Sequence, residues 1–197
     1  MNKYFVHARK YVVWNMFSWA FLSFLPIPAF AQGEDIVETK NYSIAVQGDL
    51  GGFKLTSESK EIESGLELVT IRLKAEKLLS PPKLTLSWEH PLHNVAGLWS
   101  AEKEWNKELI WQYDFTSRLA TYAPVITYFS TENVNVHTFA VSDAINSVRM
   151  SAKVNEINGN AICSVSLFTE PHPLMSTYEF TIRLDKRNIP YYQALQE

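Results

Sequence analysis

The feature of the sequence that most constrains the fold is the two-residue period with which apolar side chains recur. The period is clear in residues 42–46, 84–88 and 178–184, where large apolar side chains alternate with polar or small ones. Successive side chains of an extended strand point to opposite faces, so this alternation indicates strands that are buried on one face. No long segment shows the spacing of an amphipathic helix. We therefore expect an all-β protein of about ten strands, folded as an antiparallel β-sandwich.

Three local signals refine this expectation. Asn158-Gly159 between two alternating segments predicts a type I′ hairpin, because this dipeptide tolerates positive φ best. Leu66 and Leu68 are apolar at even-numbered positions, whereas from Val69 onward the apolar side chains fall at odd-numbered positions. A strand keeps one face buried across such a change if it contains an extra residue, so we expect a β-bulge near Leu68-Val69. Residues 90–107 show no clean alternation, and we expect them to be irregular.

The first 31 residues have the order of a secretory signal peptide. A basic start without acids is followed by the apolar run 11–25, by Pro26 and Pro28, and by a small-x-small pattern ending at Ala31. A retained membrane anchor is the alternative, but the run is shorter than the roughly 20 residues that a bilayer needs. We expect cleavage after Ala31, a periplasmic or secreted protein, and no membrane contact after cleavage. The expected domains are 1–31 (signal peptide), 32–184 (β-sandwich) and 185–197 (start of a linker).

Composition excludes several classes of protein. Apolar residues make up 46% of the chain and charged residues 20%, which allows a full core and argues against disorder. A formal charge of −3 argues against a nucleic-acid partner. Cys163 is the single cysteine, so the chain forms no internal disulfide, and we expect this side chain to be a small buried hydrophobe.

The sequence offers no marked catalytic or metal-binding pattern. Acidic side chains at 61/63, 102/104 and 143 could form a carboxylate pair, but nothing distinguishes an acid from a nucleophile among them. His90 and His93 have a spacing that could suit zinc, although no cysteine or carboxylate cluster accompanies them. We expect no catalytic residue, no metal site and no cofactor in this chain.

Tryptophan side chains are the best candidates for ligand contact. Trp88 and Trp111 fall in phase with the apolar positions of their alternating segments, so we expect their side chains to fill the core. Trp99 and Trp105 fall in the expected irregular stretch, where binding residues concentrate, and indole faces can stack on sugars. We therefore take Trp99, Trp105 and His90 as candidate carbohydrate-binding residues.

The C-terminal segment differs from the rest. Residues 185–190 are polar and turn-like, and residues 191–197 begin a helical pattern that is too short to be stable alone. We expect this segment to lead elsewhere, with Tyr191, Tyr192 and Leu195 poorly buried.

A series of short motifs resembles one known family. The run Leu84-x-Leu-x-Trp-Glu-His-Pro is followed by Gly97-Leu98-Trp99, by residues 123–125, 139–144 and 163–168, and by the exit 182–195. In this order the motifs resemble the N-terminal domain of bacterial α-galactosidase-like glycoside hydrolases, the melibiase group of family 36 and its relatives in clan D. The resemblance covers residues 42 to 197.

The resemblance implies a non-catalytic role. In such enzymes a galactose-mutarotase-like supersandwich precedes a (β/α)₈ barrel that carries both catalytic aspartates, and no position of this chain corresponds to either of them. The implied partner is that catalytic barrel, absent from this chain, with galactosides or other glycans as candidate ligands. The alternatives are a free-standing secreted carbohydrate-binding module and a structural, adhesin-like sandwich.

Overall fold

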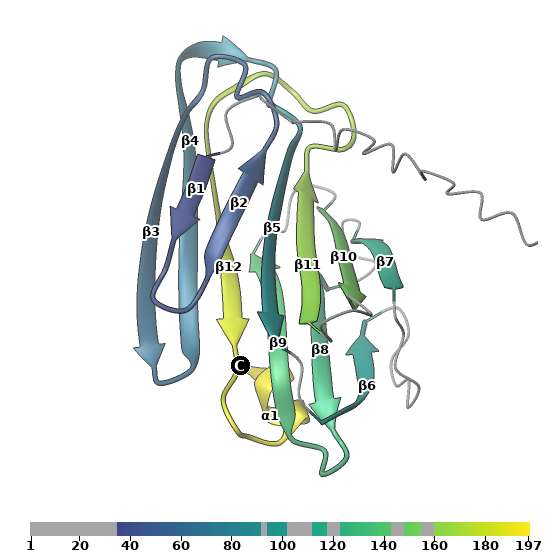
Figure 1. Ribbon diagram of the computed structural model, residues 1–197. Helices are drawn as coiled ribbons and strands as arrows, with labels where there is room; N and C mark the ends of the chain where they lie inside the picture. Colours follow the sequence, from purple (N-terminus) through teal and green to yellow (C-terminus); the bar gives the residue numbers. More distant parts are fainter. Residues whose placement is uncertain (1–34, 92–93, 102–111, 118–122, 143–147, 155–159) are drawn as a thin grey trace, which may run out of the picture. The chain divides into compact units, whose positions relative to one another are not determined.

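The computed structural model describes residues 35–91, 94–101, 112–117, 123–142, 148–154 and 160–197 (Figure 1). The expected signal peptide, Trp105, Trp111, His93 and the Asn158-Gly159 turn lie outside these residues. The elements are β1 (Asp35–Glu38), β2 (Ser43–Gln47), β3 (Lys54–Glu63), β4 (Leu66–Leu79), β5 (Leu84–Pro91), β6 (Val95–Ser100), β7 (Gln112–Ser117), β8 (Val125–Ser130), β9 (Asn135–Ser142), β10 (Val148–Val154), β11 (Asn160–Leu167), β12 (Met175–Asp185) and α1 (Tyr191–Gln196).

The strands of the described residues form two six-stranded antiparallel sheets. One sheet has the order β1-β2-β5-β11-β10-β7, and the other has the order β3-β4-β12-β9-β8-β6. The alternating segments of the sequence are these strands, and their apolar side chains form one buried cluster that draws on both sheets. The predicted all-β antiparallel sandwich is therefore confirmed.

Aromatic contacts join the two sheets through this core. The ring of Trp88 on β5 meets the ring of Phe139 on β9 edge-on, with centroids 5.4 Å apart and planes at 89°. Trp88 is 2% exposed and Phe139 is fully buried, so the prediction that Trp88 fills the core is confirmed. Cys163 is also fully buried, as its position in an apolar strand predicted.

The β-bulge expected near Leu68-Val69 is wrong. Leu68 pairs with Arg183 on β12 and with Lys60 on β3, and the register continues through Val69 without a break on either side. Glu67 instead takes the inward position in line with Val69, and it is 1% exposed. The register irregularity lies on the partner strand β3, between Glu61 and Glu63. The strand β4 therefore contains no extra residue at this point. Its inward position before Val69 is filled by the buried carboxylate of Glu67 instead of an apolar side chain.

The expectation of an irregular stretch over 90–107 is also wrong in part. Residues 95–100 form β6, which pairs with β8 at the edge of its sheet. Gly97 and Leu98 are buried there, and the register is irregular between Val95 and Gly97. This irregularity explains why the strand shows no clean alternation.

The C-terminal segment turns back onto the sandwich. After β12, the carbonyl of Ile189 accepts the Asn135 N–H at 2.7 Å, and the carbonyl of Asn133 accepts the Tyr191 N–H at 3.1 Å. The six-residue helix α1 follows and buries Ala194. Tyr192 is 57% exposed, as expected, whereas Tyr191 and Leu195 are half-buried.

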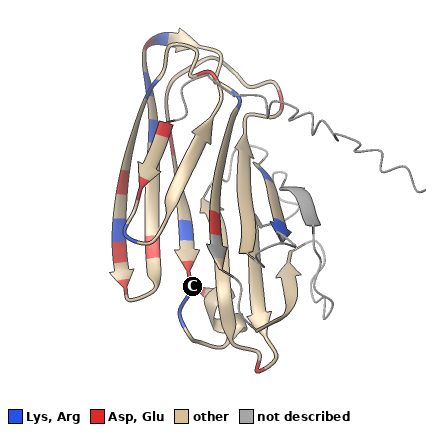
Figure 2. Ribbon diagram, in the orientation of Figure 1, with Lys and Arg blue, Asp and Glu red and all other residues tan. Residues whose placement is uncertain are grey.

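Charge is unevenly distributed along the ribbon formed by β3 and β4. Figure 2 shows basic positions toward the end where β3 begins. Toward the end where β3 stops and β4 starts, most charged positions are acidic, with Lys60 among them. The acidic end carries the polar clusters described next. In the described part of the chain, α1 is the only α-helix, and no helix is long and apolar enough to cross a membrane.

Candidate functional site

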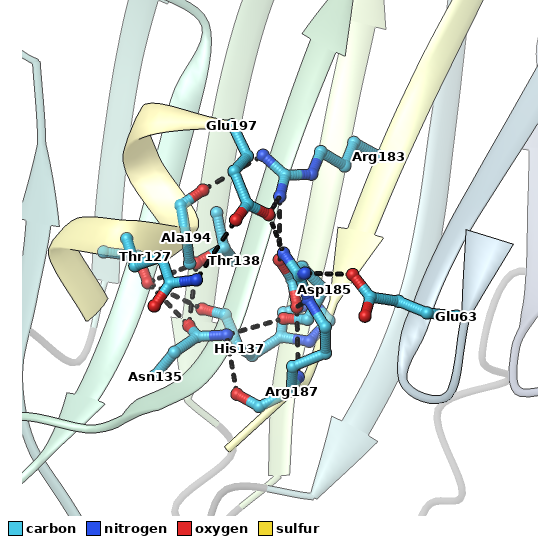
Figure 3. A network of polar contacts seen from close by, with 11 residues as sticks. Glu63, Thr127, Asn135, His137, Thr138, Arg183, Asp185, Arg187, Ala194 and Glu197 are labelled. Atoms are coloured by element: carbon cyan, nitrogen blue, oxygen red, sulfur yellow. Dashed lines mark hydrogen bonds and ion pairs between the residues drawn. The ribbon is translucent and has the colours of Figure 1, made fainter. Parts of the chain in front are cut away.

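A cluster of ion pairs around the buried side chain of Asp185, called the C-terminal anchor here, consists of Arg183, Asp185, Arg187 and Glu197 (Figure 3). The Asp185 side chain is completely buried. One of its oxygens accepts bonds from Arg183 Nη2 at 2.9 Å and Arg187 Nη2 at 2.7 Å, and the other accepts Arg187 Nε and the Arg187 backbone N–H, both at 3.0 Å. Two guanidinium groups and one backbone amide therefore saturate this carboxylate.

The anchor extends to the chain end and to β3. Arg187 Nη2 donates to Glu197 at 2.6 Å, and Arg187 Nη1 pairs with Glu63. Arg183 Nη1 donates to the carbonyl of Ala194 at 3.0 Å, which ties α1 to β12. The hydrogen bond to Asp185 raises the pKa of Arg187, and the hydrogen bond from Arg187 lowers the pKa of Glu197. Arg187 and Glu197 are thus both held in their ionised forms.

A buried amide connects the anchor to the neighbouring strands. Asn135 on β9 donates from Nδ2 to the carbonyl of Asp185 at 3.2 Å and to that of Arg187 at 3.4 Å. Its Oδ1 accepts from the hydroxyls of Thr127 at 3.0 Å and Thr138 at 2.7 Å. Because both ends of the Asn135 amide have hydrogen-bond partners, this side chain connects β8, β9 and the segment after β12.

A second cluster surrounds Glu67. Its carboxylate accepts the Lys40 N–H at 3.1 Å, the Asn41 amide at 3.2 Å and the Thr39 hydroxyl at 3.3 Å, together with the Ser59 hydroxyl. Burial alone would raise the pKa of Glu67, but the hydrogen bonds from Ser59, Asn41, Lys40 and Thr39 hold it below its ordinary value. Glu67 therefore fixes the turn between β1 and β2 against β4 as a carboxylate.

The buried thiol of Cys163 and the buried phenols of Tyr42 and Tyr128 are held in their neutral forms. Burial raises the pKa of the Cys163 thiol and of the Tyr128 phenol. Burial, with smaller contributions from Cys163, Glu67 and Asp185, raises the pKa of Tyr42, whose hydroxyl lies 3.4 Å from His137 Nδ1. A buried thiol in an apolar strand has little thiolate character and is a poor nucleophile.

These clusters lack the signature of a catalytic acid pair. Among the described residues, the carboxyl groups with a shifted pKa are Glu67 and Glu197, and both are shifted downward. A general acid needs the opposite shift, so neither group suits that role. Within the same residues, no group of three or more His, Cys, Asp or Glu side chains could hold a metal ion.

The residues predicted to bind carbohydrate do not form one site in the described structure. Trp99 lies on the edge strand β6, where it is half-buried and pairs with Thr127 of β8. His90 lies on β5 of the other sheet, opposite Ala161. Trp105 falls outside the described residues. The prediction of a carbohydrate site at these positions stays a prediction.

Sequence reasoning missed both polar clusters. The run from Arg183 to Arg187 places charges at every second position of a strand end, which was a usable signal for the anchor. For Glu67 no local signal exists, because its partners Thr39 and Asn41 lie 28 and 26 residues away.

The fold and the closed clusters define an antiparallel β-sandwich with buried structural ion pairs. No model of a known protein family matches the chain, and no curated protein matches it. Among solved structures, the chain is similar to the Slr1438 protein from Synechocystis sp. PCC 6803, with 8% identity and a TM-score of 0.43. The similarity covers 78% of this chain and 66% of the Slr1438 chain.

Proposed function

We propose that this chain is a non-catalytic supporting domain, the N-terminal β-sandwich of an exported α-galactosidase-like glycoside hydrolase. In this proposal the sandwich packs on a (β/α)₈ catalytic barrel that is not part of the sequence. The observation that carries the proposal is the C-terminal anchor. Its ion pairs, centred on the buried carboxylate of Asp185, hold residues 185–197 on the sandwich.

A supporting domain needs such an anchor for a physical reason. Domains joined by a free linker move relative to one another by default, whereas a barrel and its supporting sandwich must keep one orientation. Arg187 bridges Asp185 and Glu197, and Arg183 holds the carbonyl of Ala194, so the segment leaving β12 is tied at several points. Tyr192, which is 57% exposed on α1, is available for contact with a following domain.

The proposal is tested with the purified chain and p-nitrophenyl α-galactoside. We expect no turnover above background, and we expect the gene region downstream of Glu197 to encode a (β/α)₈ barrel. Co-expression of that barrel with this chain should give a complex that hydrolyses the substrate. Turnover by the chain alone, lost on replacing one of its own carboxylates, contradicts the proposal, as does a downstream region without a barrel.

A second candidate function is a free-standing carbohydrate-binding module. The observation that favours it is Trp99, an indole that remains partly accessible on the edge strand β6. Calorimetric titration with galactosides should then give measurable heat, and Trp99→Ala should remove it. Tyr192→Ala is the control, because Tyr192 is also an accessible aromatic but lies on α1. The absence of heat with galactosides and other glycans counts against this function.

A further inference from the structure

A basic hollow lies at the end of the β3–β4 ribbon that is opposite the acidic end. Its cavity volume is about 750 Å³, and three lysines line it, Lys54 on β3 with Lys74 and Lys77 on β4. Glu76 is the single acidic side chain of the lining. Small-ligand pockets commonly have volumes of about 300–1,000 Å³, so the hollow has the size of a binding site.

Two of the three lysines of the hollow, Lys54 and Lys74, share one face of the ribbon. Lys54 and Lys74 are directly opposite in the pairing of β3 with β4. Like charges in this position destabilise a sheet because their side chains share one face. Arg72, the outward-facing residue of β4 that precedes Lys74, has acidic partners that balance its charge. Its guanidinium group pairs with Glu58 at 3.2 Å and with Glu179.

Within the described residues, Lys54, Lys74 and Lys77 form no such ion pair, although the chain as a whole carries a net charge of −3. Lys54 begins β3 and Lys74 and Lys77 lie toward the end of β4, whereas Glu61 and Glu63 lie at the far end of β3. The positive charge is therefore a local property of this end of the ribbon, which concentrates an anion there.

One wall of the hollow is backbone. Gly51 and Gly52 line it, and both have positive φ, 59° and 93°. A Cβ at Gly52 would lie 3.2 Å from Leu79 Cδ1, so a larger residue would press on the lining. The nearby carboxylate of Asp49 accepts the Gly51 N–H at 2.9 Å, which holds the loop in this shape.

We propose that this hollow binds a small organic ligand carrying a tetrahedral oxyanion, a phosphate or sulfate ester. Lys54 and Lys74 bind the oxyanion between them, and Lys77 adds a third positive charge at the rim. Lysine acts toward phosphate as a compact point charge, which suits an oxyanion held between converging side chains. Glu76 accepts a hydrogen bond from a hydroxyl on the organic part. This site does not depend on the function proposed above.

Calorimetry on the purified full chain at low ionic strength tests the proposal. Glucose 6-phosphate and glucose 6-sulfate are the ester probes, inorganic phosphate and sulfate are the free-ion probes, and glucose is the neutral control. We expect saturable binding of at least one ester, tighter than that of the corresponding free ion, and none of glucose. Binding should weaken as NaCl is added, because the attraction is ionic.

Variants locate the binding. Lys54→Gln and Lys74→Gln should each weaken ester binding about tenfold, as expected for loss of one charge-assisted contact. Lys60→Gln is the matched control, since Lys60 is an exposed lysine of β3 outside the hollow, opposite Leu68. It should bind the ester as the unaltered chain does.

A second readout separates binding from folding. Without ligand, Lys74→Gln should keep or raise the melting temperature, because it removes a like-charge pair. The ester should raise the melting temperature of the unaltered chain and of Lys60→Gln, but not of the Lys54→Gln/Lys74→Gln double variant. The proposal is overturned if no ester binds saturably, if glucose or the free ions bind equally well, or if Lys60→Gln weakens binding as much as Lys74→Gln.

Discussion

At the scale of single residues, the most informative side chain is Glu67. A carboxylate with 1% exposure is costly unless hydrogen bonds replace its lost water. Here two hydroxyls, one side-chain amide and one backbone amide supply those bonds. The same contacts hold the β1–β2 turn, so one buried charge organises two segments that are distant in the sequence.

Replacing Glu67 tests this role. Glu67→Gln presents an amide group to partners that all donate, so at least one buried donor loses its acceptor. We expect a loss of about 1–3 kcal/mol in the free energy of unfolding, measured by urea denaturation. Glu61→Gln is the control, because Glu61 makes an exposed ion pair with Lys40 at 2.5 Å, and such pairs contribute about 0–1 kcal/mol. Equal losses in the two variants contradict the assigned role.

Comparison of the unaltered chain with Glu67→Gln also gives a pH prediction. The pKa of Glu67 is lowered in the folded chain. Its contribution to stability is therefore fully present above the unfolded value of about 4.3 and is lost as the pH falls through the folded value. Between about pH 7 and pH 3, the unaltered chain should lose stability more steeply than Glu67→Gln. Parallel curves for the two proteins are the contrary outcome.

The polar residues of the core were the part of the structure that sequence could not predict. Alternation predicts the inward direction of Val69, Ile71 and Leu73 because burial of apolar side chains is a local property of a strand. The inward direction of Glu67 depends on donors in β3 and in the β1–β2 turn, which only the folded chain brings close. Asp185 differs, because the guanidinium groups that pair with its carboxylate belong to Arg183 and Arg187, each two residues away. Only the contact of Asn135 with its backbone carbonyl depends on a distant strand.

At the scale of elements, strands with regular alternation were predictable and strands with irregular pairing were not. β5, β11 and β12 coincide with alternating segments, and β4 ends at Leu79, just before Pro81-Pro82. β6 was missed because its irregular register with β8 puts Gly97 and Leu98 side by side in buried positions. A pairing irregularity is set by the partner strand, so its position cannot be read from one segment.

The ribbon strand β3 is an exposed edge with unusual length. It has ten residues, and all but Leu55 are exposed. Exposed edge strands invite pairing with other chains, and charged side chains are a common protection. The glutamates and lysines of β3 fit this purpose at its acidic end.

The helix α1 depends on packing for its stability. A six-residue helix is marginal alone, and here the ring of Tyr191 lies on that of Phe129, with centroids 5.0 Å apart. We expect Tyr191→Ala to cost about 1–3 kcal/mol in unfolding free energy and to speed tryptic cleavage at Lys186 and Arg187. Tyr192→Ala, which removes a ring that is 57% exposed, should change neither quantity appreciably. Similar cleavage rates in both variants contradict the docking of α1 through Tyr191.

At the scale of the whole sandwich, stability comes from one apolar cluster that both sheets share. The cluster includes side chains from β2 and β5 of one sheet and from β4 and β12 of the other. No disulfide reinforces it, because Cys163 is the single cysteine of the sequence. Because both sheets share this core, we expect that neither sheet keeps its structure when the other unfolds.

Phe139 offers a direct test of this coupling, because its buried ring on β9 contacts Trp88 across the interface between the sheets. Phe139→Ala leaves a cavity under both sheets and should cost about 3–5 kcal/mol. Far-ultraviolet circular dichroism and tryptophan fluorescence should report the same lowered urea midpoint, since one cooperative unit unfolds. Ile162→Ala on β11 is the control, because Ile162 is 41% exposed and its removal should cost about 0.5 kcal/mol or less. Two separate transitions in Phe139→Ala, or a shift in only one signal, contradict the shared core and indicate sheets that unfold independently.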